Sequence, residues 1–195
     1  MDDLQTIESV NFEIIPELLI EIEETRNAAK LLATKHLDGV ICISGTFHLG
    51  NLILELDKAL NVPILLWGLP ELPYDGGKIR LNSVCGVNLN ASNLYKSGNR
   101  YFHVTIGDTV DEDWIDAIRV GAALSRAHIG IAGFRAHGFF NLGVYDLNVY
   151  RQIGILLDHY ELQEIFEMKV SSEAVHAKKE KILATFDVST ITSGQ

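Results

Sequence analysis

The chain contains 195 residues, of which 47% are hydrophobic, and it carries a formal net charge of −10 at pH 7. An acidic chain without a Lys/Arg cluster is a poor match for a nucleic-acid-binding protein, and no apolar run approaches the ~18 residues that a membrane span needs. Neither a secretory signal pattern nor a CxxC or zinc-like cysteine spacing is present, so we expect a cytoplasmic protein in which Cys42 and Cys85 are buried free thiols.

Short apolar, β-branched runs alternate with helical patterns along the chain. The predicted strands lie at residues 10–15, 40–43, 64–67, 101–106, 128–133 and 155–160. The predicted helices lie within residues 17–37, 52–60, 83–97, 111–127, 144–153, 162–168 and 173–184. Helical crossovers of this length require parallel strands with helices on both faces of the sheet. The pattern therefore predicts an α/β protein with a doubly wound, three-layer α/β/α sheet of the Rossmann-like or flavodoxin-like kind.

One stretch, DGVICISGTFHLGN at residues 38–51, joins a buried strand to a helix through a polar, glycine-containing loop. In open α/β sheets such loops lie at the carboxyl ends of the strands, where ligands bind. Ser44, Thr46, His48 and Asn51 in this stretch can all hydrogen-bond to a polyhydroxylated or anionic ligand.

Two later loops also follow predicted strands. The first, GLPELPYDGG at residues 68–77, holds Glu71 and Asp75 between prolines that restrict its conformations. The second, FRAHGFFNLG at residues 134–143, holds Arg135, which suits an anionic or hydroxyl-rich ligand, and His137. The alternatives are a solvated surface loop for the two carboxylates and a surface salt bridge for Arg135.

Several well-known catalytic and nucleotide-binding motifs are missing from the sequence. It contains neither GxGxxG after a strand nor GxxxxGK[ST], which disfavours a standard phosphate-binding loop. It also lacks GxSxG and HExxH, the signatures of α/β-hydrolases and of zinc peptidases.

Four segments in a shared order resemble the L-arabinose isomerase and L-fucose isomerase superfamily of sugar isomerases. They are DGVICISGTFHLGN at residues 38–51, VPILLWGLPELPYD at 62–75, SVCGVNLNASNLYKSGNRYFHVTIGD at 83–108 and HIGIAGFRAHGFFNLGVYDLNVYRQIG at 128–154. The resemblance implies that residues 1–127 form the N-terminal Rossmann-like domain without its first strand. It also implies that residues 128–195 begin a second, similar α/β domain.

Members of this family interconvert aldoses and ketoses with a divalent metal, usually manganese. The resemblance places their metal ligands outside the matched segments, so it implies no metal site in this chain alone. The positions that match family loops near the sugar cleft, taken together with the two loop carboxylates, form the expected substrate-binding set: Thr46, Phe47, His48, Glu71, Asp75, Arg135 and His137.

The resemblance thus predicts the N-terminal and middle portion of an aldose–ketose isomerase, which binds a small sugar, forms homo-oligomers and interacts with neither nucleic acid nor membrane. We expect the isolated chain to be inactive while it supplies substrate-cleft loops and oligomer contacts. The alternative is a non-catalytic sugar-binding or regulatory α/β domain. A third reading, an enzyme with Cys85 as nucleophile, lacks a histidine or lysine nearby in the sequence.

Overall fold

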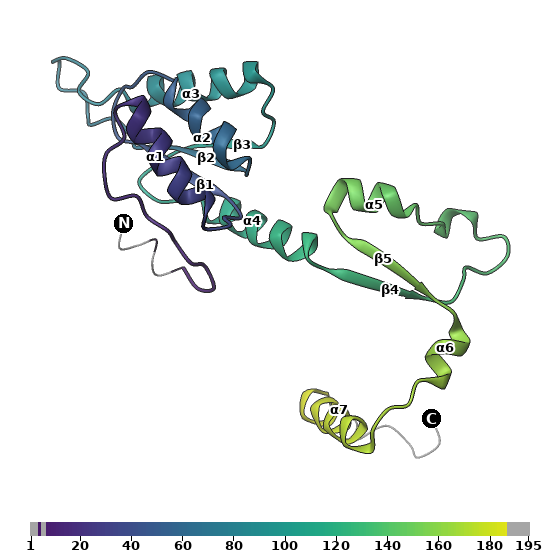
Figure 1. Ribbon diagram of the computed structural model, residues 1–195. Coiled ribbons are helices and arrows are strands. Elements are labelled where there is room, and N and C mark those ends of the chain that lie inside the picture. Colours follow the sequence, from purple (N-terminus) through teal and green to yellow (C-terminus); the bar gives the residue numbers. More distant parts are fainter. Residues whose placement is uncertain (1–3, 5–6, 187–195) are drawn as a thin grey trace. The chain divides into compact units, whose positions relative to one another are not determined.

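Helices and short parallel strands alternate along the computed structural model, which describes Leu4 and residues 7–186 (Figure 1). The chain divides into two units, Met1–Leu124 and Ser125–Gln195, and each has its own parallel sheet. The α/β, Rossmann-like fold class predicted from the sequence is confirmed. Among the described residues, no helix is both long enough and apolar enough to cross a membrane.

The first unit is built on three parallel strands in the order β1-β2-β3. Their bounds are Val40–Ser44 for β1, Ile64–Gly68 for β2 and Phe102–Ile106 for β3. The helices are α1 (Ile22–Ala33), α2 (Leu52–Leu60), α3 (Ser83–Ser97) and α4 (Glu112–Ser125). All five residues of β2 are buried, as expected for the central strand of a parallel sheet with both faces covered.

The side chains of β2 alternate between two hydrophobic clusters, one on each face of this sheet. Ile64 and Leu66 belong to the cluster that also contains residues of the first three helices: Ala29, Ile53, Leu56, Val87 and Leu94. Leu65 and Trp67 belong to the other cluster, against which Phe12 and Trp114 pack. Since Trp114 lies on α4, helices cover both faces and the unit is three-layered.

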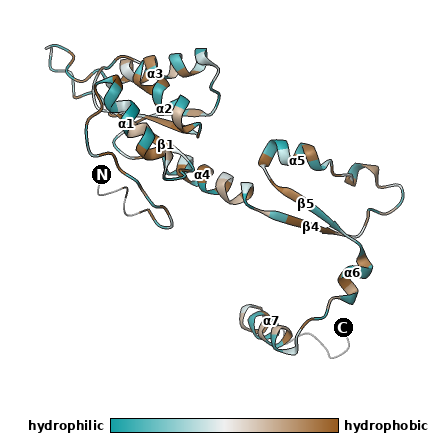
Figure 2. Cartoon of the chain, in the orientation of Figure 1, coloured by the Kyte–Doolittle hydropathy of each residue, from teal (hydrophilic) through white to brown (hydrophobic). Residues whose placement is uncertain are grey.

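The second unit contains the parallel pair β4 (His128–Ala132) and β5 (Leu156–Tyr160). Its helices are α5 (Asp146–Ile153), α6 (Leu162–Glu167) and α7 (Ser172–Thr185), with a short 3₁₀ segment, η2, at Phe140–Leu142. Hydrophobic residues occur in both strands (Figure 2), yet Ile155 is the one buried residue among those that the structure describes in this unit. A two-stranded sheet with so little burial has marginal stability by itself.

The prediction of a strand in the N-terminal region is wrong. Residues 10–15 form no strand, and Phe12 packs instead beside Leu65 and Trp67. A strand needs a neighbour to complete its hydrogen bonds, and in the described part of the chain this segment pairs with neither edge of the sheet. The first helix lies within the predicted range of residues 17–37. It starts at Ile22, where a reciprocal capping box between Glu21 and Glu24 satisfies its first amides.

Candidate functional site

The loops that follow β1 and β2 are tied together at the carboxyl edge of the first sheet. The Thr46 hydroxyl and the Phe47 backbone N–H both donate to the Leu81 carbonyl, at 2.9 and 2.7 Å. Leu81 lies just before α3, at the end of the long loop that leaves β2. The structure therefore brings the first two predicted substrate-binding residues against the loop that contains Glu71.

The Glu71 carboxylate closes that long loop upon itself. It accepts hydrogen bonds from the backbone N–H groups of Leu72 and Leu81, each at 3.1 Å, and of Asn82 at 2.6 Å. These bonds, the one from Asn82 first, hold the pKa of Glu71 below its ordinary value of 4.5. The carboxylate is thus engaged within the loop, where it fixes the entry into α3.

His48 is held by the end of its own strand and by the following helical layer. Its Nε2 lies 2.8 Å from the hydroxyl of the buried Ser44, four residues earlier. The ring packs on Gly86 in the first turn of α3, where a Cβ atom would lie 2.7 Å from Nε2. The Asn93 amide, further along α3, donates to the Gly50 carbonyl at 2.7 Å. The loop of residues 45–51 is thereby attached along α3.

Asp75 occupies the exposed outer part of the β2–α3 loop, which projects from the unit (Figure 1). Its carboxylate accepts the Gly77 N–H at 3.0 Å and lies 3.5 Å from the Arg80 guanidinium. No hydrogen bond or ion pair within the described residues joins it to Thr46, Phe47 or His48. The geometry of Asp75 is that of a loop-stabilising acid.

Arg135 and His137 lie in the second unit, in the loop that follows β4. The Arg135 guanidinium donates to the Phe140 carbonyl at 2.9 Å, and its Cζ lies 5.4 Å from the Phe140 ring centre and 5.9 Å from that of Phe134. Both rings are exposed, so a cation sits beside two accessible aromatic faces. His137 is exposed, and the described part of the chain shows no hydrogen bond to it.

Sequence reasoning missed a carboxylate–imidazole pair in the second unit. His159 Nε2 lies 3.1 Å from Asp146 Oδ2, although the two residues are thirteen positions apart. Read separately, Asp146 looks like an ordinary acid in the first turn of a helix and His159 like a strand residue on the surface. The order β4, α5 and parallel β5 places the start of α5 and the end of β5 at the same edge of the sheet, which is where Asp146 and His159 lie.

The cysteines offer no support for a thiol nucleophile. Both are free, and burial raises the pKa of Cys42, on β1, to about 12. The expectation that both are buried is wrong for Cys85, which is exposed in the first turn of α3, while Cys42 is half-buried.

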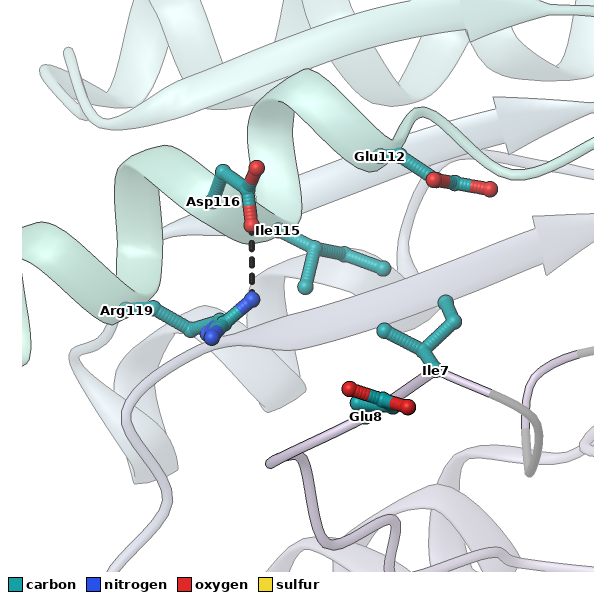
Figure 3. Close-up of a pocket in the computed structure, with 6 residues that line it drawn as sticks. All are labelled: Ile7, Glu8, Glu112, Ile115, Asp116 and Arg119. Carbon is teal, nitrogen blue, oxygen red and sulfur yellow. Dashed lines mark hydrogen bonds and ion pairs between the residues drawn. The ribbon is translucent and has the colours of Figure 1, made fainter.

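A pocket of about 280 Å³ lies elsewhere in the first unit, between the N-terminal segment and α4 (Figure 3). Its lining is mostly charged and consists of Ile7, Glu8, Glu112, Ile115, Asp116 and Arg119. Arg119 is paired with Asp116 at 2.9 Å. The pocket includes none of the predicted substrate-binding residues. Within the described residues, no group of three or more His, Cys, Asp and Glu side chains is arranged to hold a metal ion.

We expect Glu71→Gln to reduce the dependence of stability on pH in the acid range. Because the folded-state pKa of Glu71 is lowered, its contribution is fully present above its ordinary pKa and is lost as pH falls through the folded-state value. Gln keeps one acceptor oxygen and loses the charge, so the variant should be less stable than wild type near neutral pH and should converge with it in acid. Urea unfolding at several pH values measures this difference.

Asp75→Asn is the matched control, since Asp75 accepts a single backbone N–H in the same loop. A Glu71→Gln variant with the same acid profile as wild type would show that the three amides do not depend on the carboxylate charge.

No family model matches the chain. It is similar to sulfoquinovose isomerases of Priestia aryabhattai and Priestia megaterium, with 27% identity over 162 residues, 79% of this chain and 36% of each relative. The similarity to a sulfoquinovose isomerase of a Clostridium species is 26% over 80% of the chain. The chain thus spans about a third of the length of these relatives. The matched share exceeds the 124 residues of the first unit, so the similarity includes residues of both units.

These relatives are sugar isomerases, in agreement with the general prediction from the sequence motifs. They are named sulfoquinovose isomerases, whereas those motifs resemble L-fucose and L-arabinose isomerases.

Proposed function

We propose that this chain is part of an aldose–ketose isomerase and that a sulfoquinovose-type sugar is its first candidate substrate. The observation that carries the proposal is the similarity to three curated sugar isomerases over about four-fifths of the chain. L-Fucose and L-arabinose remain the alternative substrates because the motif order resembles that superfamily. The same proposal has two further parts. The two units correspond to successive domains of such an enzyme, and the enzyme is cytoplasmic.

In each unit, considered by itself, the candidate sugar-binding groups lie in loops at the carboxyl edge of its sheet. In the first unit, Thr46 and Phe47 are held in place by the β2–α3 loop, and the Phe47 ring is exposed. In the second unit, Arg135 combines a positive charge with two exposed aromatic rings. Sulfoquinovose is a hexose with a sulfonate group, and a guanidinium fork suits such an anion.

A divalent metal such as manganese is part of this proposal through the family resemblance alone. The described residues contain no suitable group of ligands, so we assign none of them to a metal and derive no chemical step through one. Homo-oligomerisation is proposed on the same basis. Light scattering that finds only monomer at micromolar concentration would contradict it.

A non-catalytic sugar-binding role is the second candidate. It is supported by the engagement of Glu71 and His48 in bonds within the fold. These bonds use both side chains to hold the loops of the first unit together.

Incubation with sulfoquinovose, L-fucose and L-arabinose in the presence of manganese tests the proposal, with ketose formation and thermal-shift binding measured on the same samples. Formation of the ketose supports the isomerase. A sugar-dependent thermal shift without turnover favours the binding role, and absence of both signals contradicts both functions.

Arg135→Gln is expected to weaken the binding of sulfoquinovose about tenfold or more, since a hydrogen bond to a charged group contributes about 1.5–3 kcal/mol. Its effect on uncharged L-fucose should be smaller. Arg151→Gln on α5, whose guanidinium bonds to Asn148, is the matched control and should leave both affinities unchanged. Equal losses of affinity for the two sugars would show that Arg135 does not bind the sulfonate. Isothermal titration calorimetry of wild type and the two variants gives the six affinities.

A further inference from the structure

The Asp146–His159 pair lies at the carboxyl edge of the second sheet, where ligands bind in open α/β folds. His159 is the penultimate residue of β5, and Asp146 is the first residue of α5. Their side chains approach to 3.1 Å and are each about half exposed, 52% for His159 and 47% for Asp146. Both groups are therefore accessible to a molecule in solution.

The arrangement determines which ring nitrogen can accept a proton. Asp146, the first residue of α5, presents its carboxylate oxygen Oδ2 to His159 Nε2 at 3.1 Å. An ionised carboxylate only accepts hydrogen bonds, so it selects the tautomer in which Nε2 carries the hydrogen. In the neutral ring, the lone pair then lies on Nδ1, for which the described residues supply no donor. A histidine oriented in this way by an aspartate is a common proton acceptor in enzymes.

The loop after β4 adds ligand-binding groups at the same edge. It begins at Gly133, whose N–H donates at 2.9 Å to the carbonyl of Tyr160, the residue next to His159. Arg135 in this loop lies against the exposed rings of Phe134 and Phe140. An aromatic face and a guanidinium are suited to hold a sugar ring that carries an anionic substituent. The pair thus lies at the sheet edge that carries the second unit's proposed sugar-binding loop.

We propose that His159, oriented by Asp146, opens the cyclic form of the sugar. This inference rests on the proposed function, because an aldose has to open before its carbonyl can isomerise. His159 Nδ1 takes the proton of the anomeric hydroxyl, and the O–H electron pair becomes the second bond of the C1 carbonyl. The bond between C1 and the ring oxygen breaks, its electron pair stays on that oxygen, and a water molecule supplies the proton. The imidazolium then returns its proton to the resulting hydroxide.

The same sheet contains a second histidine–aspartate pair that serves as a matched control. His128 Nδ1 lies 3.6 Å from Asp158 Oδ2, and both side chains are at least half exposed. His128 is the first residue of β4, at the amino end of the strand, and Asp158 pairs in register with Gly130. This pair has similar chemistry and lies away from the carboxyl edge.

Ring opening can be measured without isomerisation as the exchange between the α and β anomers of sulfoquinovose, followed by proton NMR with the full 195-residue chain. Wild type should accelerate the exchange, and both His159→Gln and Asp146→Asn should reduce the acceleration at least tenfold. His128→Gln and Asp158→Asn should stay within twofold of wild type. Asp146→Glu should restore part of the rate lost in Asp146→Asn. Added imidazole should rescue His159→Ala, a response that a purely structural role for this histidine would not produce.

The inference is overturned if wild type does not accelerate anomer exchange, if the His159 and Asp146 variants retain the wild-type rate, or if the control variants lose as much. Thermal unfolding of each variant identifies losses that come from misfolding, and imidazole rescue tests His159 independently of that effect. Anomer exchange without ketose formation would uphold the ring-opening role and contradict the isomerase. Ketose formation with unaltered exchange in His159→Gln would uphold the isomerase and contradict the role of His159.

Discussion

Replacement of Leu66 by alanine is expected to lower the free energy of unfolding of the first unit by about 2–5 kcal/mol. Leu66 is fully buried at the centre of β2, in a cluster with Val87 and Leu94 of α3. The cost combines the lost transfer free energy of the side chain with that of the cavity left behind, since strands on both sides limit collapse of the site. Urea unfolding followed by circular dichroism gives the difference.

Leu31→Ala on α1 is the control for this variant, since Leu31 is 54% exposed. Surface substitutions of this kind change stability by about 0.5 kcal/mol or less. If Leu66→Ala lowered the free energy of unfolding no more than Leu31→Ala does, β2 would not lie at the centre of the core.

The elements predicted best from the sequence are those that end at a residue with a special backbone conformation. Helices α2 and α3 have the predicted bounds because Asn61 and Gly98 adopt the left-handed conformation that ends a helix. Strand β2 could be predicted because a run of apolar residues follows Pro63. The structure buries all five residues of this strand. In these segments the local preference and the tertiary environment agree.

Where the prediction failed, the outcome depended on distant parts of the chain. Residues 10–15 have the alternation of a strand, but a strand also needs a partner, which a local pattern does not reveal. At the start of α4, the Asp111 carboxylate accepts the Trp114 N–H at 3.0 Å, as a helix cap does. Hydrophobic periodicity likewise predicted the helices of the second unit without showing that all the described residues of α6 and α7 are exposed.

The position of the candidate site could be predicted from the sequence, but its hydrogen bonds could not. Loops after parallel strands were expected to carry it, and Thr46 and Phe47 do lie at such an edge. The sequence did not reveal that Glu71 would bind the backbone amides of its own loop, because those amides lie up to eleven residues away. Asp146 and His159 are joined only by the packing of α5 against β5.

Gly50→Ala is expected to destabilise the first unit by about 1–3 kcal/mol, the usual cost of overpacking a tight site. A Cβ on this buried glycine would lie 2.6 Å from the Asn93 amide nitrogen and 3.0 Å from the backbone carbonyl of Leu89. The Asn93 side chain can rotate, at the cost of its bond to Gly50, but the Leu89 backbone moves only with α3. The loop should therefore separate from the helix, which exposes the Phe47 N–H that now bonds to Leu81. Urea unfolding and hydrogen exchange at Phe47 measure the two effects.

Gly45→Ala in the same loop is the matched control. A Cβ there would have its nearest neighbour at 4.0 Å, the Leu69 Cδ1 atom, which is an ordinary contact. Neither glycine has a positive φ, so alanine adopts either backbone conformation without strain. Gly45→Ala should be neutral or stabilise by about 0.4–1 kcal/mol, because alanine restricts the unfolded chain. Equal stability of the two variants, with unchanged exchange at Phe47, would mean that contact between this loop and α3 does not hold Phe47 at the sheet edge.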